Sequence, residues 1–155
     1  GARLIASDAD TARLVHLRST FRGREGVEVR APHELDALRG SVDLALLDVP
    51  CSNTGVLARR PEARYRFGRA QRRRLGEVQR SILERARELL APRGAILYST
   101  CSVEPEENER MVAWACERLA LRAERESLHL PRGLPGDPMP RYTDASYAAL
   151  LVPRA

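Results

Sequence analysis

Short apolar segments alternate along this chain with longer segments in which apolar residues recur at helical spacing. Taken as strands, the apolar segments lie at residues 3–7, 27–30, 42–47, 95–99 and 147–152. Helical spacing predicts helices over residues 9–21 and 71–90 and a third that begins near Pro105. Because parallel strands need a crossover between them, this order predicts an α/β fold: a doubly wound, mostly parallel sheet with helices on both faces.

Three segments allow more local predictions. Residues 42–47 are almost continuously apolar, which is typical of a strand buried on both faces of a parallel sheet. The helix over 71–90 is expected to end at the Pro-Arg-Gly segment of residues 92–94. We assign the acidic residues of the segment 104–109 to the start of the third helix, where negative charge matches the helix dipole. Residues 131–140, rich in proline and glycine, predict a loop.

Length and composition bound the class of protein. With 155 residues, of which 43% are hydrophobic, the chain can bury one core, so we expect a single domain over residues 1–155. No segment approaches the roughly 18 apolar residues of a membrane span, and the first residues lack the features of a signal peptide. The expectation is a monomeric cytoplasmic protein with no membrane partner. Its three cysteines and three histidines match neither a zinc pattern nor a disulfide framework, so we expect reduced thiols and no metal.

The start of the chain predicts a missing element. A nucleotide-type cofactor normally needs a glycine-rich turn after the first strand of such a sheet, and the early candidate at residues 22–26 is in the wrong place. The chain also begins with Gly1 rather than Met and runs directly into an apolar segment. We therefore expect the first strand and the cofactor loop to be missing here and to belong to a preceding segment of a longer protein.

Positive charge is concentrated in one segment. The formal net charge is +5, and residues 59–74 hold eight arginines against one acid, Glu62. Tyr65 and Phe67 lie among these arginines, a combination that suits a polyanion carrying stackable bases. A solvated, charge-rich loop followed by a helix start explains the same residues equally well. The composition alone leaves both interpretations open.

Two cysteines each stand at the end of an apolar segment. Cys51 follows the segment 42–50, and Cys101 follows the segment 95–100. Side chains just past the carboxyl ends of strands converge on the ligand crevice of an α/β sheet, so both thiols are placed to face one substrate. A single cysteine at a strand end is usually packing, and we interpret Cys116, on a helix face, in that way. The pair favours catalysis.

Two long motifs give the chain a family resemblance. The segments DVPCSNTGVLARRPEARYRF and QRSILERARELLAPRGAILYSTCSVEPEENE resemble the RNA cytosine-5 methyltransferases of the RsmB or Fmu/Sun group. The resemblance implies a Rossmann-like methyltransferase fold, S-adenosylmethionine as cofactor and RNA as partner, with rRNA favoured over tRNA. It also implies roles for individual residues. Those beside the cofactor are Asp8, Asp48 and Pro50, those near the RNA are Arg59, Arg60 and Arg64, and those in catalysis are Cys101, Cys51 and Asp48.

The chemistry of that family explains why thiols are needed. Carbon 5 of cytosine is a poor nucleophile, so a thiolate must first add to carbon 6, and the resemblance assigns this to Cys101. Asp48 is expected to stabilise the adduct at ring nitrogen 3, and Cys51 is expected to assist product release. The positive end of a helix beginning near Pro105 is expected to lower the pKa of the Cys101 thiol.

Three functions are compatible with these motifs. We favour methyl transfer to carbon 5 of a cytosine in RNA through a covalent cysteine adduct. The alternative is a non-catalytic RNA-binding relative that has lost the cofactor site. A DNA methyltransferase is less favoured, because those enzymes place the nucleophile in the Pro-Cys motif. For Asp8, an alternative to ribose binding is a cap at the start of the helix over 9–21.

Overall fold

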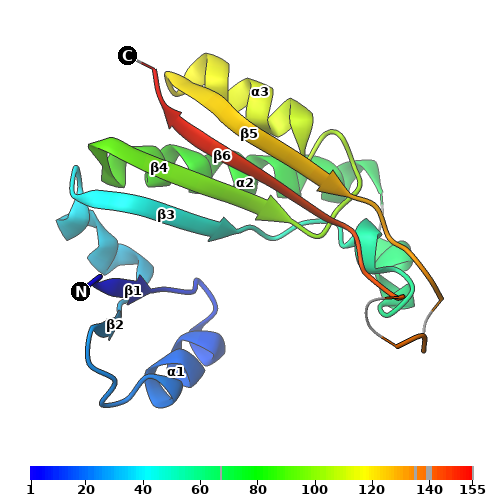
Figure 1. Ribbon diagram of the computed structural model, residues 1–155, viewed down its shortest axis with the longest axis horizontal. Coiled ribbons are helices and arrows are strands. Elements are labelled where there is room, and N and C mark those ends of the chain that lie inside the picture. Colours follow the sequence, from blue (N-terminus) through cyan, green and yellow to red (C-terminus); the bar gives the residue numbers. More distant parts are fainter. Residues whose placement is uncertain (67, 135, 139–140, 155) are drawn as a thin grey trace. The chain divides into compact units, whose positions relative to one another are not determined.

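A computed structural model describes residues 1–66, 68–134, 136–138 and 141–154 (Figure 1). The chain forms two compact units, Gly1–Arg39 and Gly40–Ala155. The single domain expected over residues 1–155 stays a prediction. No described helix is long and apolar enough to cross a membrane. Among the described residues, no group of three or more His, Cys, Asp or Glu side chains is placed to hold a metal ion.

The first unit is a small parallel β-α-β arrangement. Strand β1 (Leu4–Ala6) pairs in parallel with β2 (Val27–Val29), and helix α1 (Thr11–Thr20) connects them. The short 3-10 helix η1 (Pro32–Leu38) follows. Strand β1 was expected to be buried, but Leu4 is 53% exposed. The predicted strands and helix therefore exist, with less burial than their apolar residues suggested.

The second unit contains a four-stranded sheet in the order β3-β4-β6-β5. β3 and β4 are parallel, whereas β6 runs antiparallel to both of its neighbours, β4 and β5. The segment after β3, which shows no clear periodicity in sequence, forms two 3-10 helices. In chain order the elements are β3 (Val42–Asp48), η2 (Thr54–Val56), η3 (Pro61–Arg66), α2 (Arg69–Leu89), β4 (Leu90–Thr100), α3 (Glu109–Arg118), β5 (Leu121–His129) and β6 (Ser146–Pro153).

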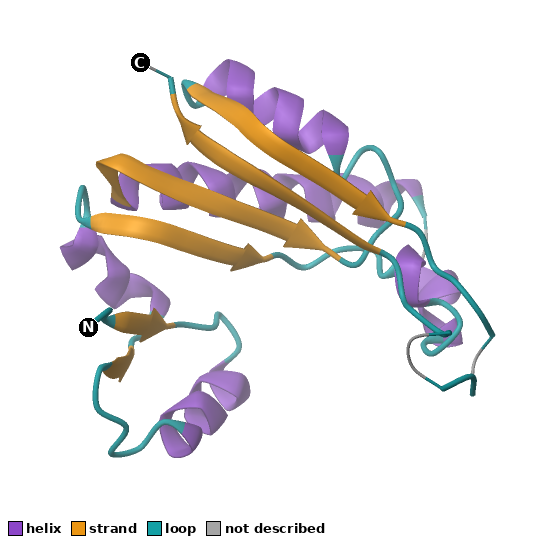
Figure 2. Ribbon diagram, in the orientation of Figure 1, coloured by secondary structure: helices purple, strands orange, loops and turns teal. Residues whose placement is uncertain are grey.

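Helices α2 and α3 both pack on one face of this sheet (Figure 2). The opposite face carries exposed apolar side chains on β3, since Leu44 is 57% and Leu46 is 66% exposed. The expectation that this strand is buried on both faces is therefore wrong for the described chain. No described helix of this unit covers that opposite face. The core between the sheet and the two helices includes Leu83, Ala86, Ile96, Tyr98, Met111, Ala115, Leu121, Ala149 and Leu151, with Cys116 partly buried against it.

Several element boundaries differ from the sequence predictions. Helix α2 ends at Leu89, and β4 begins at once, so the Pro-Arg-Gly segment lies inside the strand. A Cβ at Gly94 would meet the carbonyl oxygen of Val42 at 2.5 Å, so glycine permits the close approach of β3. The strand β5 was not predicted. Among the described strands it pairs with β6 alone, and most of its residues are exposed, four of the nine being Arg or Glu, as is common for an edge strand.

Helix α3 begins four residues later than the position expected near Pro105. Its first residue is Glu109, and Pro105 lies in a turn that precedes it. The backbone N–H of Arg110 donates to the Pro105 carbonyl at 2.9 Å, which closes this turn. Residues 105–108 thus form a turn before the helix, Glu109 stands in the first helical turn, and the path of the preceding turn determines where Glu107 points.

Candidate active site

The two cysteine motifs meet at one edge of the four-stranded sheet. β3 and β4 are parallel with Asp48 opposite Ser99, so both strands end at the same edge. Cys51 and Cys101 follow these ends, and their Sγ atoms lie 3.3 Å apart. Both side chains are half-buried. Two residues that are far apart in sequence are thereby brought into hydrogen-bond contact by strand pairing alone.

The loop that carries Cys51 has an unusual backbone. Asn53 adopts a left-handed conformation, with φ 60° and ψ 25°, which asparagine tolerates better than most residues. Gly55 then approaches the second motif, where its N–H donates to the Cys101 carbonyl at 3.0 Å. A Cβ on Gly55 would lie 2.7 Å from that carbonyl oxygen and 2.5 Å from the Ala145 Cβ. The absence of a side chain at this position allows the two loops to touch.

The two thiols have opposite electrostatic environments. A hydrogen bond from the Cys51 thiol lowers the pKa of Cys101 to about 7, with burial and the negative charge of Asp48 opposing and Arg60 assisting. The same hydrogen bond, together with burial, raises the pKa of Cys51. In its thiol form Cys101 donates to the Asn53 Oδ1 at 2.9 Å. Near neutral pH a large fraction of Cys101 is thus thiolate, whereas Cys51 keeps its proton.

This finding changes the explanation of the reactive thiol. The sequence pattern attributed a lowered pKa of Cys101 to the positive end of a helix near Pro105. The helix starts only at Glu109, and the largest cause of the lowered pKa is the hydrogen bond from Cys51. The second cysteine therefore takes the activating role that the helix was expected to have.

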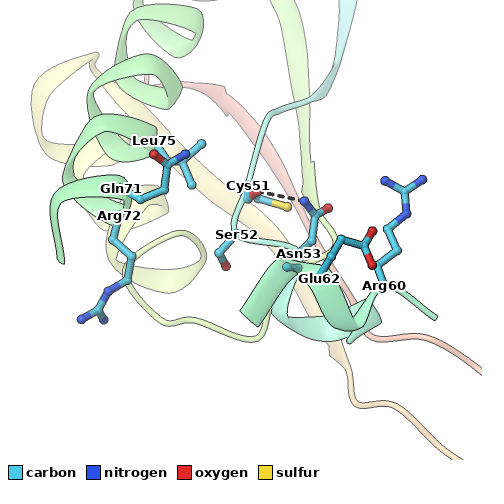
Figure 3. Close-up of a pocket in the computed structure, with 9 residues that line it drawn as sticks. Cys51, Ser52, Asn53, Arg60, Glu62, Gln71, Arg72 and Leu75 are labelled. Atoms are coloured by element: carbon cyan, nitrogen blue, oxygen red, sulfur yellow. Dashed lines mark hydrogen bonds between the residues drawn. The ribbon is translucent and has the colours of Figure 1, made fainter. Parts of the chain in front are cut away.

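A polar cavity of about 120 Å³ opens beside Cys51. Figure 3 shows the loop residues Cys51–Asn53 between helix α2 on one side and the pair Arg60 and Glu62 on the other. Helix α2 contributes Gln71, Arg72 and Leu75, and Ser52 and Ala63 complete the lining. Two arginines, Arg60 and Arg72, thus line the cavity beside Cys51, and cationic side chains suit a polyanionic substrate.

The expected RNA-contacting arginines differ in their surroundings. Of Arg59, Arg60 and Arg64, the cavity lining includes Arg60 alone. Arg59 forms an ion pair with Asp144, which also accepts a hydrogen bond from the Tyr142 hydroxyl at 2.7 Å. Arg64 lies over the ring of Tyr65, 4.9 Å from its centroid. Phe67 lies outside the described residues.

The expected cofactor residues are distributed over both units. In the first unit, Asp8 accepts a hydrogen bond from the Asp10 N–H at 2.8 Å and pairs with Arg13 at 3.2 Å. Asp10 caps helix α1, so the alternative role of Asp8 as the helix cap is wrong. In the second unit, Asp48 is exposed at the end of β3, and the Pro50 carbonyl accepts a hydrogen bond at 2.9 Å from Gln79.

Buried polar side chains beneath the two loops were not predicted. Glu107 is 2% exposed, and Gln79 and Asn108 are fully buried. Our assignment of residues 104–109 to a helix start alone is wrong for Glu107, whose carboxylate accepts hydrogen bonds from Ser52. Residues 107 and 108 lie in a turn before the helix, so their helical spacing to Met111 and Val112 is no signal of their burial.

Comparisons with known proteins agree with this geometry. Residues 1–133 match the family described as 16S rRNA methyltransferase RsmB/F. The ribosomal RNA small subunit methyltransferase B of Sodalis glossinidius is 36% identical over 121 residues, which are 72% of this chain and 27% of that protein. The ribosomal RNA small subunit methyltransferase F of Cronobacter sakazakii is 36% identical over 92 residues, or 59% of this chain and 19% of that protein. The chain thus spans about a quarter of these relatives.

Solved structures share the fold. The crystal structure of PH0851 superposes with a TM-score of 0.73 at 27% identity, covering 96% of this chain and 36% of that protein. The structure of NSun6 from Pyrococcus horikoshii with SFG gives a TM-score of 0.70 at 23% identity, covering 97% and 41%. The Rossmann-like methyltransferase fold expected from the motifs is confirmed. By its sequence match over residues 1–133, the chain belongs to the RsmB/F family of 16S rRNA methyltransferases.

Proposed function

We propose that this chain is the catalytic part of an enzyme that transfers a methyl group from S-adenosylmethionine to carbon 5 of a cytosine in rRNA. One observation carries the proposal. Two thiols with opposite pKa shifts lie 3.3 Å apart at the ends of adjacent parallel strands. The names of the relatives, which are rRNA methyltransferases, support rRNA as the substrate.

In this proposal Cys101 is the nucleophile. Its sulfur forms a bond to carbon 6 of the base, and the electron pair of the carbon 5–carbon 6 double bond becomes available at carbon 5. The Asp48 carboxyl is assigned to ring nitrogen 3, where it stabilises the adduct. When bound, S-adenosylmethionine supplies an electrophilic methyl group. A pKa of about 7 makes a large fraction of Cys101 thiolate at neutral pH.

Cys51 acts after methyl transfer. Having lost its own proton to solvent, it removes the proton from carbon 5 as a thiolate. The electrons of that C–H bond re-form the double bond, and the bond between carbon 6 and Cys101 breaks with its electron pair left on the Cys101 sulfur. The raised pKa of Cys51 has the hydrogen bond to Cys101 as its largest cause. Once Cys101 is bonded to carbon 6 it no longer carries a thiolate charge, so this contribution disappears and Cys51 ionises more readily. The ionised thiol is thus Cys101 before the adduct forms and Cys51 after methyl transfer.

Cofactor and RNA are assigned to different residues. Asp8, just past the end of β1, and Asp48, the last residue of β3, are assigned to the cofactor, because a carboxylate acceptor suits the hydroxyl groups of a ribose. Pro50 is assigned to the cofactor with them. Arg60, which lines the cavity, is assigned to the RNA backbone together with Arg59 and Arg64. The target base must be flipped out or single-stranded to reach Cys101.

The test is methyl transfer by the whole protein to rRNA, with the product nucleoside identified by mass spectrometry. The proposal predicts 5-methylcytidine. A non-catalytic RNA-binding relative would bind the RNA and leave it unmethylated, and methylation at another atom would contradict the roles given to the thiols. A monomeric state and a cytoplasmic location stay predictions, which sedimentation and cell fractionation would check.

A further inference from the structure

We propose that Glu107 is a positioning residue that holds the Cys51 loop in the geometry needed for product release. The inference rests on the proposed function, because it assigns a partner to the step given to Cys51. It starts from a buried carboxylate. Glu107 is 2% exposed, lies in the turn between Cys101 and helix α3, and is not one of the residues that line the cavity.

The carboxylate of Glu107 binds the residue next to Cys51. The backbone N–H of Ser52 donates to its two oxygens at 2.9 and 3.2 Å, and the Ser52 hydroxyl donates at 2.6 Å. Hydrogen bonds to an ionised acceptor are roughly twice as strong as neutral ones. A buried carboxylate is costly unless such donors are present, so Glu107 and the loop stabilise each other.

The residue on the other side of Cys51 is also held. Gln79 of helix α2 donates to the Pro50 carbonyl at 2.9 Å and to the Glu107 Oε1 at 3.5 Å. The Glu107 carbonyl accepts a hydrogen bond at 2.7 Å from the hydroxyl of Tyr98, a fully buried residue of β4. Cys51 is thus fixed between two anchored neighbours, and both anchors join at Glu107.

The loop of Cys101 has separate support. Thr100 donates to Asn108 at 2.6 Å, and Asn108 donates to the Ser102 carbonyl at 2.9 Å. Gly55 binds the Cys101 carbonyl through its backbone. The link from Glu107 to this loop is indirect, through the 3.1 Å contact between the Ser52 and Ser102 hydroxyls. Loss of the Glu107 charge is therefore expected to disturb Cys51 more than Cys101.

The decisive variant is Glu107→Gln, which keeps the size of the side chain. One oxygen becomes an NH2 group, which cannot accept a hydrogen bond from Ser52. We expect release to slow about tenfold, equivalent to about 1.4 kcal/mol, and adduct formation at Cys101 to fall by a smaller factor. The readout is the amount and lifetime of the protein–RNA adduct on denaturing gels after a single turnover of the whole protein. Glu109→Gln, an exposed change two positions along the chain, is the matched control.

The outcomes separate this inference from the proposed function. Cys51→Ala is run beside the variant: if it traps no adduct, the proposed function fails. If Cys51→Ala traps an adduct and Glu107→Gln releases RNA as fast as the Glu109→Gln control, the positioning role is overturned. Equal losses in adduct formation and release would show a merely structural role and would also overturn it. Should Glu107→Gln fail to fold, Ser52→Ala removes the hydroxyl that donates to Glu107, together with its contacts to Thr54 and Ser102, keeps the backbone N–H donor, and is expected to slow release in the same direction.

Discussion

The two cysteine loops occupy the same sheet edge, yet their surroundings differ in kind. Cys101 follows a strand that runs through the core, and local contacts hold its loop. Cys51 lies in a loop with a left-handed residue, and distant side chains of α2 and of the turn before α3 hold it. The pKa of Cys101 is lowered and that of Cys51 is raised. The two identical side chains therefore differ in acidity because their surroundings differ, and a change to one thiol is expected to change the pKa of the other.

The strongest way to break this difference is to remove the hydrogen bond between the thiols. In Cys51→Ala the pKa of Cys101 is expected to rise from about 7 toward its ordinary value of 9.0. Since only the thiolate reacts with iodoacetamide, alkylation of Cys101 increases as pH rises through the pKa. At pH 7 we expect the rate of Cys101 alkylation to fall roughly tenfold or more in the variant. Once the pKa lies above the pH, each further unit lowers the fraction of thiolate about tenfold.

Mass spectrometry of the alkylated peptides across pH 5.5 to 10 measures this shift, with Cys116→Ala as the control. Cys116 packs against the core away from the two loops, so its removal should leave the midpoint unchanged. A Cys101 midpoint near 9 in the unaltered protein would remove the distinction between the two thiols.

The contact between the loops can also be broken sterically. In Gly55→Ala the new Cβ would meet the Ala145 Cβ at 2.5 Å and the Cys101 carbonyl at 2.7 Å, so the loops must separate. We expect the free energy of unfolding to fall by about 1–3 kcal/mol, as in other overpacked sites. Gly76→Ala is the control, because its Cβ would meet only the Met111 Cε at 3.9 Å and alanine favours a helix. Urea unfolding compares the two, and equal stability would show that the loops do not touch.

The smallest expected effect concerns Arg60, which lines the cavity and lowers the pKa of Cys101. The logarithm of the RNA binding constant falls linearly with the logarithm of the salt concentration. Arg60→Gln should make this slope shallower by about 0.7–0.9, for one lost phosphate contact. Arg93→Gln, an exposed change near the opposite end of β4, should leave the slope unaltered. Binding titrations over several salt concentrations measure both, and an unchanged slope for Arg60→Gln would assign that arginine to a solvated face.

Sequence patterns predicted the two cysteine loops better than they predicted the buried side chains and the edge strand around them. Continuous apolar segments identified β3 and β4, and the parallel pairing then placed Cys51 beside Cys101. β5 was missed because its central residues, 122–127, are mostly charged and exposed, so this edge strand lacks the apolar alternation that identifies other strands. Glu107 was missed because an acidic residue near a helix start has a ready explanation on the surface, and only its packing reveals a buried acceptor.

The assignment of the basic segment was also limited by information absent from local sequence. The run of arginines indicated a polyanion surface, but composition does not show which arginine pairs with a distant acid. Arg59 binds Asp144, which lies far along the chain, whereas Arg60 lines the cavity. Neighbouring residues of one type thus acquire different roles through tertiary contacts.

The most direct test of the division of labour compares Cys101→Ala with Cys51→Ala in the whole protein, mixed with substrate RNA and S-adenosylmethionine and separated on denaturing gels. We predict that Cys101→Ala forms no adduct and loses methyl transfer by a factor of about 10³ or more. Cys51→Ala is predicted to accumulate a covalent protein–RNA adduct, because the bond to Cys101 forms but release is impaired. An adduct with Cys101→Ala and none with Cys51→Ala would reverse the two roles and contradict the account.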